Sequence, residues 1–245
     1  MFPLSDDDRM LIRPAWVTHG LMAANIMMFL YQLANPAFTM GYSMVPYEMT
    51  HGVDLIDSQS TQQAMQMGHT SGPVPIYLTL LFSMFMHGGW AHLGGNMLYL
   101  WIFGDNVEHR FGHVRFLAFY LLSGLVGSLC QIMLNTQSVI PNLGASGAIS
   151  GILGAYLVLF PRNQVMAIFL FRIVQIPALW VLGLWVVMQI FSGFGTLSSV
   201  GETGGVAYGA HLGGFFAGLA MGIFARIMIR EEPDTAFRKI YDRQR

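Results

Sequence analysis

The chain has 245 residues, of which 54% are hydrophobic and only 10% are charged, and its formal net charge is −1. Soluble domains carry roughly a quarter charged residues, so this composition indicates an integral membrane protein built as one domain. The nearly neutral charge, without a basic stripe, argues against nucleic acid as a partner. The single cysteine, Cys130, excludes internal disulfides and cysteine-based metal sites.

The first predicted membrane span covers about residues 15–34, because about 20 apolar residues cross the hydrocarbon core of a bilayer. The acidic residues before it favour a retained anchor over a cleaved leader. Residues 35–89 follow as an extended first loop. This loop is polar and irregular up to about residue 75, and then continues as an apolar segment too short to span, which predicts an interfacial or re-entrant piece.

Five more apolar segments complete the predicted set of spans: about 90–104, 116–135, 143–160, 173–191 and 207–229. The predicted fold is therefore an all-α integral membrane protein, a bundle of six transmembrane helices. The membrane domain would occupy residues 15–229, between a cytoplasmic N-terminal segment of residues 1–14 and a basic cytoplasmic tail of residues 230–245.

The 12 lysine and arginine residues separate by position along this pattern. They fall before the first span, between spans two and three, between spans four and five, and at the end of span six. The remaining connections have none, so the positive-inside rule predicts that both termini are cytoplasmic. Because the chain shows no Arg-rich transit peptide, the predicted location is a bacterial cytoplasmic membrane.

Ser146, His211 and Asn96 stand on spans four, six and two, each about 14 to 16 residues before the arginine near the inner end of its span. At 1.5 Å per residue these distances are roughly 21 to 24 Å, which predicts one common depth in the outer half of the bilayer. His92 precedes Asn96 by four residues and so lies on the same side of its helix. We expect a polar cluster at this level.

Spans four and six carry small residues at every fourth position, a pattern that lets membrane helices approach closely. The stripes are Ser146, Ser150 and Gly154; Gly147, Gly151 and Ala155; and Ala210, Gly214, Gly218 and Gly222. This approach would bring Ser146 and His211 into contact. A serine hydroxyl needs a base to take its proton, which His211 would supply. Neither span contains Asp or Glu, so the pattern predicts a two-residue dyad.

These motifs also carry a family resemblance. The run 144–147 reads Gly-Ala-Ser-Gly, the run 210–214 reads Ala-His-Leu-Gly-Gly, and a histidine and an asparagine stand four apart at His92 and Asn96. Together, in this order and over about residues 75–222, they resemble the rhomboid intramembrane serine proteases.

The resemblance implies an endopeptidase that cleaves transmembrane segments of other proteins near the outer face of the bilayer. Ser146 and His211 would be catalytic, and His92, Asn96 and Gly144 would stabilise the transition state. The implied partners are single-span or other membrane-protein substrates and the lipid bilayer; neither cofactor nor metal is implied, and no oligomeric state is predicted. The fifth span would correspond to the family's lateral gate.

Some features leave alternatives open. Ser150 stands where the family commonly places an aromatic residue against the base, so His211 would be oriented by Tyr208 or by a hydrogen bond from Ser150. The main rival function is a catalytically silent relative that binds membrane clients, although such proteins typically lack the serine or the histidine. A zinc protease is disfavoured, because the nearest constellation, around Glu108, falls in a predicted cytoplasmic loop.

Overall fold

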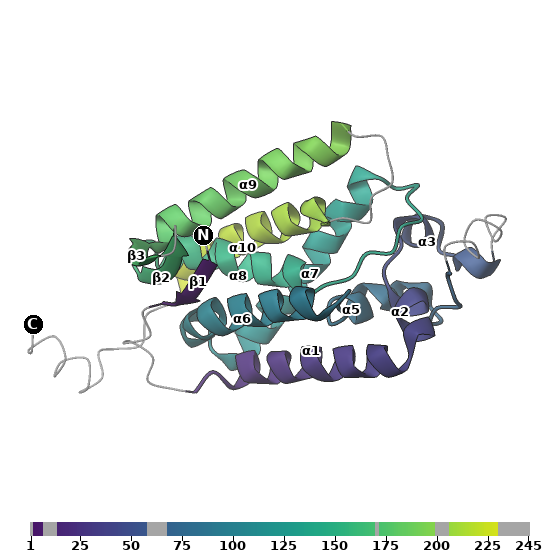
Figure 1. Cartoon of the computed structure of the whole chain (residues 1–245), viewed down its shortest axis with the longest axis horizontal. Coiled ribbons are helices and arrows are strands. Elements are labelled where there is room, and N and C mark those ends of the chain that lie inside the picture. Colours follow the sequence, from purple (N-terminus) through teal and green to yellow (C-terminus); the bar gives the residue numbers. More distant parts are fainter. Residues whose placement is uncertain (1, 7–13, 58–67, 170–171, 199–205, 230–245) are drawn as a thin grey trace, which may run out of the picture.

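The computed structural model describes residues 2–6, 14–57, 68–169, 172–198 and 206–229. Long helices run roughly along the longest axis of the molecule and form one bundle (Figure 1). They are α1 (Trp16–Ala34), α6 (Trp90–Phe111), α7 (His113–Leu134), α8 (Ser146–Leu159), α9 (Ala178–Ser198) and α10 (Tyr208–Met228). Each falls on a predicted span, although α6 and α9 both continue seven residues past the predicted ends of their spans, to Phe111 and Ser198.

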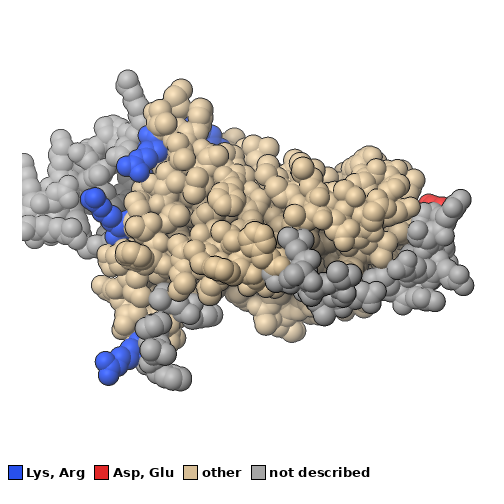
Figure 2. Space-filling model, turned by 90° about the horizontal axis from the view of Figure 1, so that it is seen from above, with Lys and Arg blue, Asp and Glu red and all other residues tan. Residues whose placement is uncertain are grey.

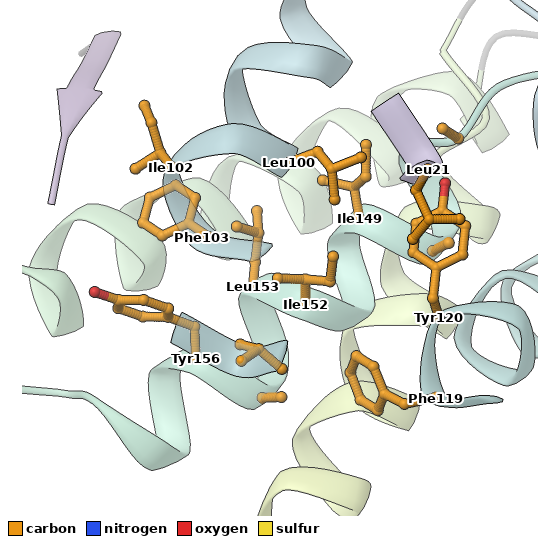
Figure 3. Close-up of a cluster of buried hydrophobic side chains, with 14 of the residues drawn as sticks. Leu21, Leu100, Ile102, Phe103, Phe119, Tyr120, Ile149, Ile152, Leu153 and Tyr156 are labelled. Atoms are coloured by element: carbon orange, nitrogen blue, oxygen red, sulfur yellow. The ribbon is translucent and has the colours of Figure 1, made fainter. Parts of the chain in front are cut away.

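Helix α8 lies at the centre of the bundle, and all of its residues from 147 to 156 are buried. Figure 3 shows Ile149, Ile152 and Leu153 of α8 among side chains from α1, α6 and α7. Ile152 and Leu153 are at most 1% exposed. Lipid tails are as apolar as leucine, so close packing holds such a centre together, more than removal of apolar surface from water.

Glycines bring α8 and α10 into backbone contact. A Cβ atom added to Gly214 would lie 1.9 Å from the carbonyl oxygen of Gly147, and one added to Gly218 would lie 1.9 Å from that of Gly151. Any side chain at these positions would force the two helices apart. The close approach predicted from the small-residue stripes is present, and it fixes the relative position of the two helix ends that carry Ser146 and His211.

The first loop is more regular than the sequence suggested. It contains α2 (Pro36–Tyr42), α3 (Pro46–His51), η1 (Leu55–Asp57), η2 (Ile76–Leu78) and α5 (Thr79–Ser83). Both α2 and α3 begin with proline, which suits the first helical position. Backbone hydrogen bonds join Met44 to Asn142, two residues before Gly144. The described parts of this segment therefore form a folded cap beside the end of α8 that begins with Ser146, where an irregular loop was expected.

A small antiparallel sheet corrects the all-α prediction. Its strands are β1 (Phe2–Ser5), β2 (Gln164–Phe169) and β3 (Arg172–Pro177), in the order β1-β2-β3. Strands β2 and β3 lie between α8 and α9 in the chain, so the fifth helix begins at Ala178 and not at residue 173. The run from 173 to 176 is apolar and β-branched, and short apolar runs do not distinguish a strand from part of a helix.

The sides of the bundle are apolar and its ends are charged. Within the described part of the chain, α7 and α10 are each long and apolar enough to cross a membrane, by length and composition, whereas Ser146–Leu159 and Ala178–Phe194 are apolar but shorter. Figure 2 shows arginine side chains gathered at the end of the molecule where the sheet lies. Large apolar side chains such as Phe191 and Phe224 are exposed along the helices. This distribution suits helices whose sides face lipid.

Candidate active site

Ser146 and His211 meet at the ends of two neighbouring helices. Ser146 is the first residue of α8, and His211 lies in the first turn of α10. The His211 Nε2 atom is 2.8 Å from the Ser146 Oγ atom, which is hydrogen-bond distance. The contact predicted from the sequence is thus present. A hydroxyl in this position can pass its proton directly to the imidazole.

The other imidazole nitrogen of His211 contacts a residue that the sequence reasoning missed. Its Nδ1 atom is 2.7 Å from Oε1 of Gln189, which lies on α9. The Trp185 ring, one turn earlier on α9, is tilted against the imidazole at a centroid distance of 6.1 Å. The sequence did contain a signal, because Gln189 follows 11 residues of α9 without a polar side chain, and polar side chains in membrane helices commonly mark functional sites.

The two groups first considered for orienting His211 behave differently. Tyr208 presents its ring edge-on to the imidazole, with centroids 6.3 Å apart. The Ser150 hydroxyl instead donates to the backbone carbonyl of Ser146, at 2.6 Å. The suggested hydrogen bond from Ser150 to the ring is therefore wrong. A serine inside a helix readily forms this bond to the carbonyl four residues before it.

His92 borders the same small space as the serine. The Gly88 N–H donates to His92 Nδ1 at 3.3 Å, so in the neutral ring the proton is on Nε2. A Cβ atom built on Gly144 would lie 3.0 Å from that Nε2 and 3.4 Å from Ser146 Oγ. The His92 Nε2–H group and the serine hydroxyl thus border the space that Gly144 leaves open. A donor here suits an oxygen that gains negative charge.

Gly144 leaves space in this site because it has no side chain. Its N–H donates to the Ser83 carbonyl at 2.8 Å, so this N–H is not available to an oxyanion in the observed conformation. The expectation that Gly144 stabilises a transition state directly is corrected in that respect. Its φ of +142°, which L side chains rarely adopt, and its contact with the His92 ring both require glycine.

The side-chain amide of Asn96 has a donor group that could bind a substrate oxygen. It is 7% exposed, and its Nδ2 atom has no hydrogen-bond partner among the described residues. A buried donor without a partner costs free energy, and a substrate oxygen could accept a hydrogen bond from this one. The backbone N–H of Ser146 is a further candidate donor, because first-turn N–H groups have no partner within their helix. No side chain of the described residues caps α8.

The Glu108 carboxylate joins two helices and is not part of the candidate site. Its carboxylate accepts hydrogen bonds from the Val17 N–H at 2.9 Å and from the Thr18 N–H and hydroxyl, both at 2.7 Å. It also contacts His113 Nδ1 at 2.5 Å. These contacts fasten the start of α1 to the end of α6. In the described part of the chain no three His, Cys, Asp or Glu side chains form a group that could hold a metal.

Comparison with known proteins agrees with this geometry. The model of the rhomboid domain family matches residues 76–227, which include Ser146, His211, His92 and Asn96. The chain belongs to the rhomboid family. Rhomboids are helical membrane proteins, and this assignment holds for the chain.

Curated rhomboid proteins from several kingdoms are similar to the chain. Rhomboid protein 1, mitochondrial, of Saccharomyces cerevisiae is 33% identical over 149 residues, which cover 59% of the chain and 41% of the yeast protein. RHOMBOID-like protein 5 of Arabidopsis thaliana is 35% identical over 143 residues, covering 58% and 42%. Rhomboid protease GluP of Bacillus subtilis is 39% identical over 145 residues, covering 59% and 26%.

In each comparison the matched region spans less than half of the relative's length. What the chain shares with these proteins is therefore the rhomboid domain itself. The relatives include a mitochondrial protein, a plant protein and a bacterial one, so the similarity does not single out one membrane. The bacterial cytoplasmic membrane stays a prediction from the sequence.

Proposed function

We propose that this rhomboid is an intramembrane serine endopeptidase that cleaves transmembrane segments of membrane proteins. The observation that carries the proposal is the 2.8 Å contact between His211 Nε2 and Ser146 Oγ. A serine packed only for structure needs no imidazole at this distance, and the similar Bacillus subtilis protein GluP is named a rhomboid protease. The family resemblance of the surrounding motifs agrees.

The proposed reaction begins when Ser146 Oγ attacks the carbonyl carbon of the substrate's peptide bond while His211 takes the hydroxyl proton. The oxygen that becomes negative would be stabilised by Asn96 Nδ2, by His92 Nε2–H and by the Ser146 N–H. His211 then returns the proton to the leaving amine as the peptide bond breaks. A water molecule, activated by His211, hydrolyses the resulting ester and frees Ser146.

The bilayer topology is part of the same proposal. We infer six spans, formed by α1 and α6 to α10, with both termini on the cytoplasmic side. The arginine-rich end of the molecule in Figure 2 supports this orientation, because basic residues favour the cytoplasmic face. The paired side chains would then lie in the outer half of the bilayer, and cleavage would occur near the outer face. The limits 15–229 of the membrane domain belong to this proposal.

The test uses the full chain in liposomes with a panel of single-span substrates that carry helix-breaking residues. Wild-type protein should cut at least one substrate, and Ser146→Ala and His211→Ala should not. Ser150→Ala is the matched control, because it removes a serine hydroxyl one turn along α8 that donates to the Ser146 carbonyl in the described structure. Cleavage that survives in both dyad variants would contradict the dyad.

A catalytically silent client-binding protein predicts a different outcome. It would bind substrates in the same liposomes without cutting any of them. A fluorophosphonate probe separates the two functions directly, because it labels a serine only when the serine is activated. Labelling of Ser146 in wild type, and its loss in His211→Ala, is expected for the protease.

A further inference from the structure

We propose that Gln189 is a positioning residue, which holds His211 in the one neutral tautomer that can accept the proton of Ser146. The inference rests on the proposed function and refines it from two residues to three. It assigns a role to an amide that the family-type motifs of the chain do not include.

Both ring nitrogens of His211 are engaged, on opposite sides. Nε2 faces Ser146 Oγ at 2.8 Å, and Nδ1 faces Gln189 Oε1 at 2.7 Å. A neutral imidazole has one N–H, and the partner of one nitrogen determines where this proton resides. The carbonyl oxygen of an amide can only accept a hydrogen bond. The proton is therefore on Nδ1, which leaves the Nε2 lone pair facing the serine hydroxyl.

The opposite tautomer would inactivate the base. With the proton on Nε2, the ring would donate to Ser146 Oγ and could not receive the hydroxyl proton. One tautomer is favoured only if Nδ1 has a hydrogen-bond acceptor. Helices α8, α9 and α10 contain no Asp or Glu that could be this acceptor. An amide is also less costly than a carboxylate to keep in a membrane interior, because it carries no net charge.

The same helix restricts the rotation of the ring. Trp185 precedes Gln189 by four residues, so the two side chains lie on one face of α9. Trp185 packs against the imidazole with an interplanar angle of 33°, while Gln189 bonds its Nδ1 atom. The ring contact limits the plane of the imidazole, and the hydrogen bond distinguishes its two nitrogens. Ring packing alone would not select a tautomer.

The direct test is spectroscopic and needs no substrate. In protein with ¹⁵N-labelled histidine, the bare and the protonated ring nitrogens give separate resonances, and His211→Phe identifies which pair belongs to His211. In wild type at neutral pH we expect a protonated Nδ1 and a bare Nε2. In Gln189→Leu we expect a mixture of tautomers. Gln131→Leu is the matched control, because Gln131 accepts from the Ala210 backbone N–H and not from the ring.

Kinetics supply the second readout. Loss of the partner that orients a metal-binding histidine typically costs about 10- to 100-fold in activity, and we expect a similar effect here: Gln189→Leu should lower kcat by about that range with little change in KM. Gln189→Glu keeps an acceptor in the same place and should restore most of the loss. A lower kcat in both variants together with a lower melting temperature would instead indicate a structural role.

The outcomes separate this inference from the proposed function. If wild type cuts no substrate and Ser146 takes no fluorophosphonate, the protease proposal fails whatever the tautomer is. If wild type cuts but Gln189→Leu keeps both the Nδ1 proton and the full kcat, the role of Gln189 is overturned and the dyad stands. If wild type already shows the proton on Nε2, the inference is wrong at its first step.

Discussion

Ser150 turns its hydroxyl to the backbone carbonyl of Ser146, one turn back along α8, and so leaves the imidazole of His211 to residues of α9 and α10. Ser150 is 2% exposed and lies within the buried stretch 147–156 of α8. The position has room for a serine, and the aromatic contacts with the His211 ring come from Trp185 and Tyr208 instead.

Placing an aromatic residue at this position should therefore harm the protein. Ser150→Phe inserts a large ring into a packed centre, and overpacking typically costs about 1 to 3 kcal/mol. We expect a lower melting temperature in detergent and no gain in cleavage. Ser150→Ala, which only removes the hydroxyl, should melt close to wild type. A faster and equally stable Ser150→Phe enzyme would show that the ring of His211 lacks support.

Glycine at position 218 should be essential for the pairing of α8 and α10. Gly218→Ala places a methyl group 1.9 Å from the Gly151 carbonyl oxygen, so the helices must separate, at an expected cost of about 1 to 3 kcal/mol or more. Gly183→Ala on α9 is the control, because its Cβ would meet nothing within 4 Å. Thermal unfolding in detergent measures both. Equal stability of the two variants would mean that the backbone contact is not tight.

Removal of the Asn96 amide should separate catalysis from stability. Loss of one oxyanion donor costs about 2.7 to 4 kcal/mol of transition-state stabilisation, so Asn96→Ala should lower kcat by about 100- to 1,000-fold. Stability should change much less, because the Nδ2 group makes no hydrogen bond within the described structure. Turnover and melting temperature are measured on the same preparation. A large drop in melting temperature with unchanged kcat would assign Asn96 to packing.

The folded cap of the first loop should loosen as pH rises. Burial raises the pKa of Glu48 from 4.5 to about 7; the nearby charge of Asp54 adds to this, and the hydrogen bond from the Leu55 N–H opposes it. Between those values the folded state binds more protons than the unfolded state. The stability of the cap therefore falls as pH rises from about 4.5 to 7 and then levels off.

Hydrogen exchange at residues 44–55, corrected for the intrinsic rate, checks this. Protection should be greater at pH 5 than at pH 8. Glu48→Gln keeps an acceptor for the Leu55 N–H but cannot ionise, so its protection should not depend on pH in this way. If wild type and Glu48→Gln respond to pH identically, another group is responsible.

The sequence was informative wherever a pattern repeats with the geometry of a membrane helix. Uninterrupted apolar length located the long helices, and glycines at every fourth position predicted the approach of α8 and α10 that brings Ser146 to His211. Both patterns work because a bilayer restricts the backbone to few structures. The common depth along the spans, and then the family motifs, predicted that His92 and Asn96 belong to the same site.

Features that depend on tertiary contacts outside the small-residue stripes and the family motifs were not predicted. The apolar run of β3 resembles the start of a helix until its partner β2 is known, and the pairing of the two strands is a tertiary property. Gln189 stands 22 residues before His211, and only the packing of α9 shows which of its neighbours it reaches. Similarly, the engagement of the Gly144 N–H with Ser83 follows from the position of α5.

The Ser146 hydroxyl, the His211 imidazole and the Gln189 amide are not held in place equally firmly. The hydroxyl and the ring belong to helices whose backbones touch, whereas the amide of Gln189 belongs to α9, which the chain enters from a hairpin. A drift of α9 by about an ångström would break a 2.7 Å bond and leave the serine and histidine in place. The proposed protease would then keep its dyad contact but lose the partner of the His211 Nδ1 atom, so the position of α9 would control the proposed reaction.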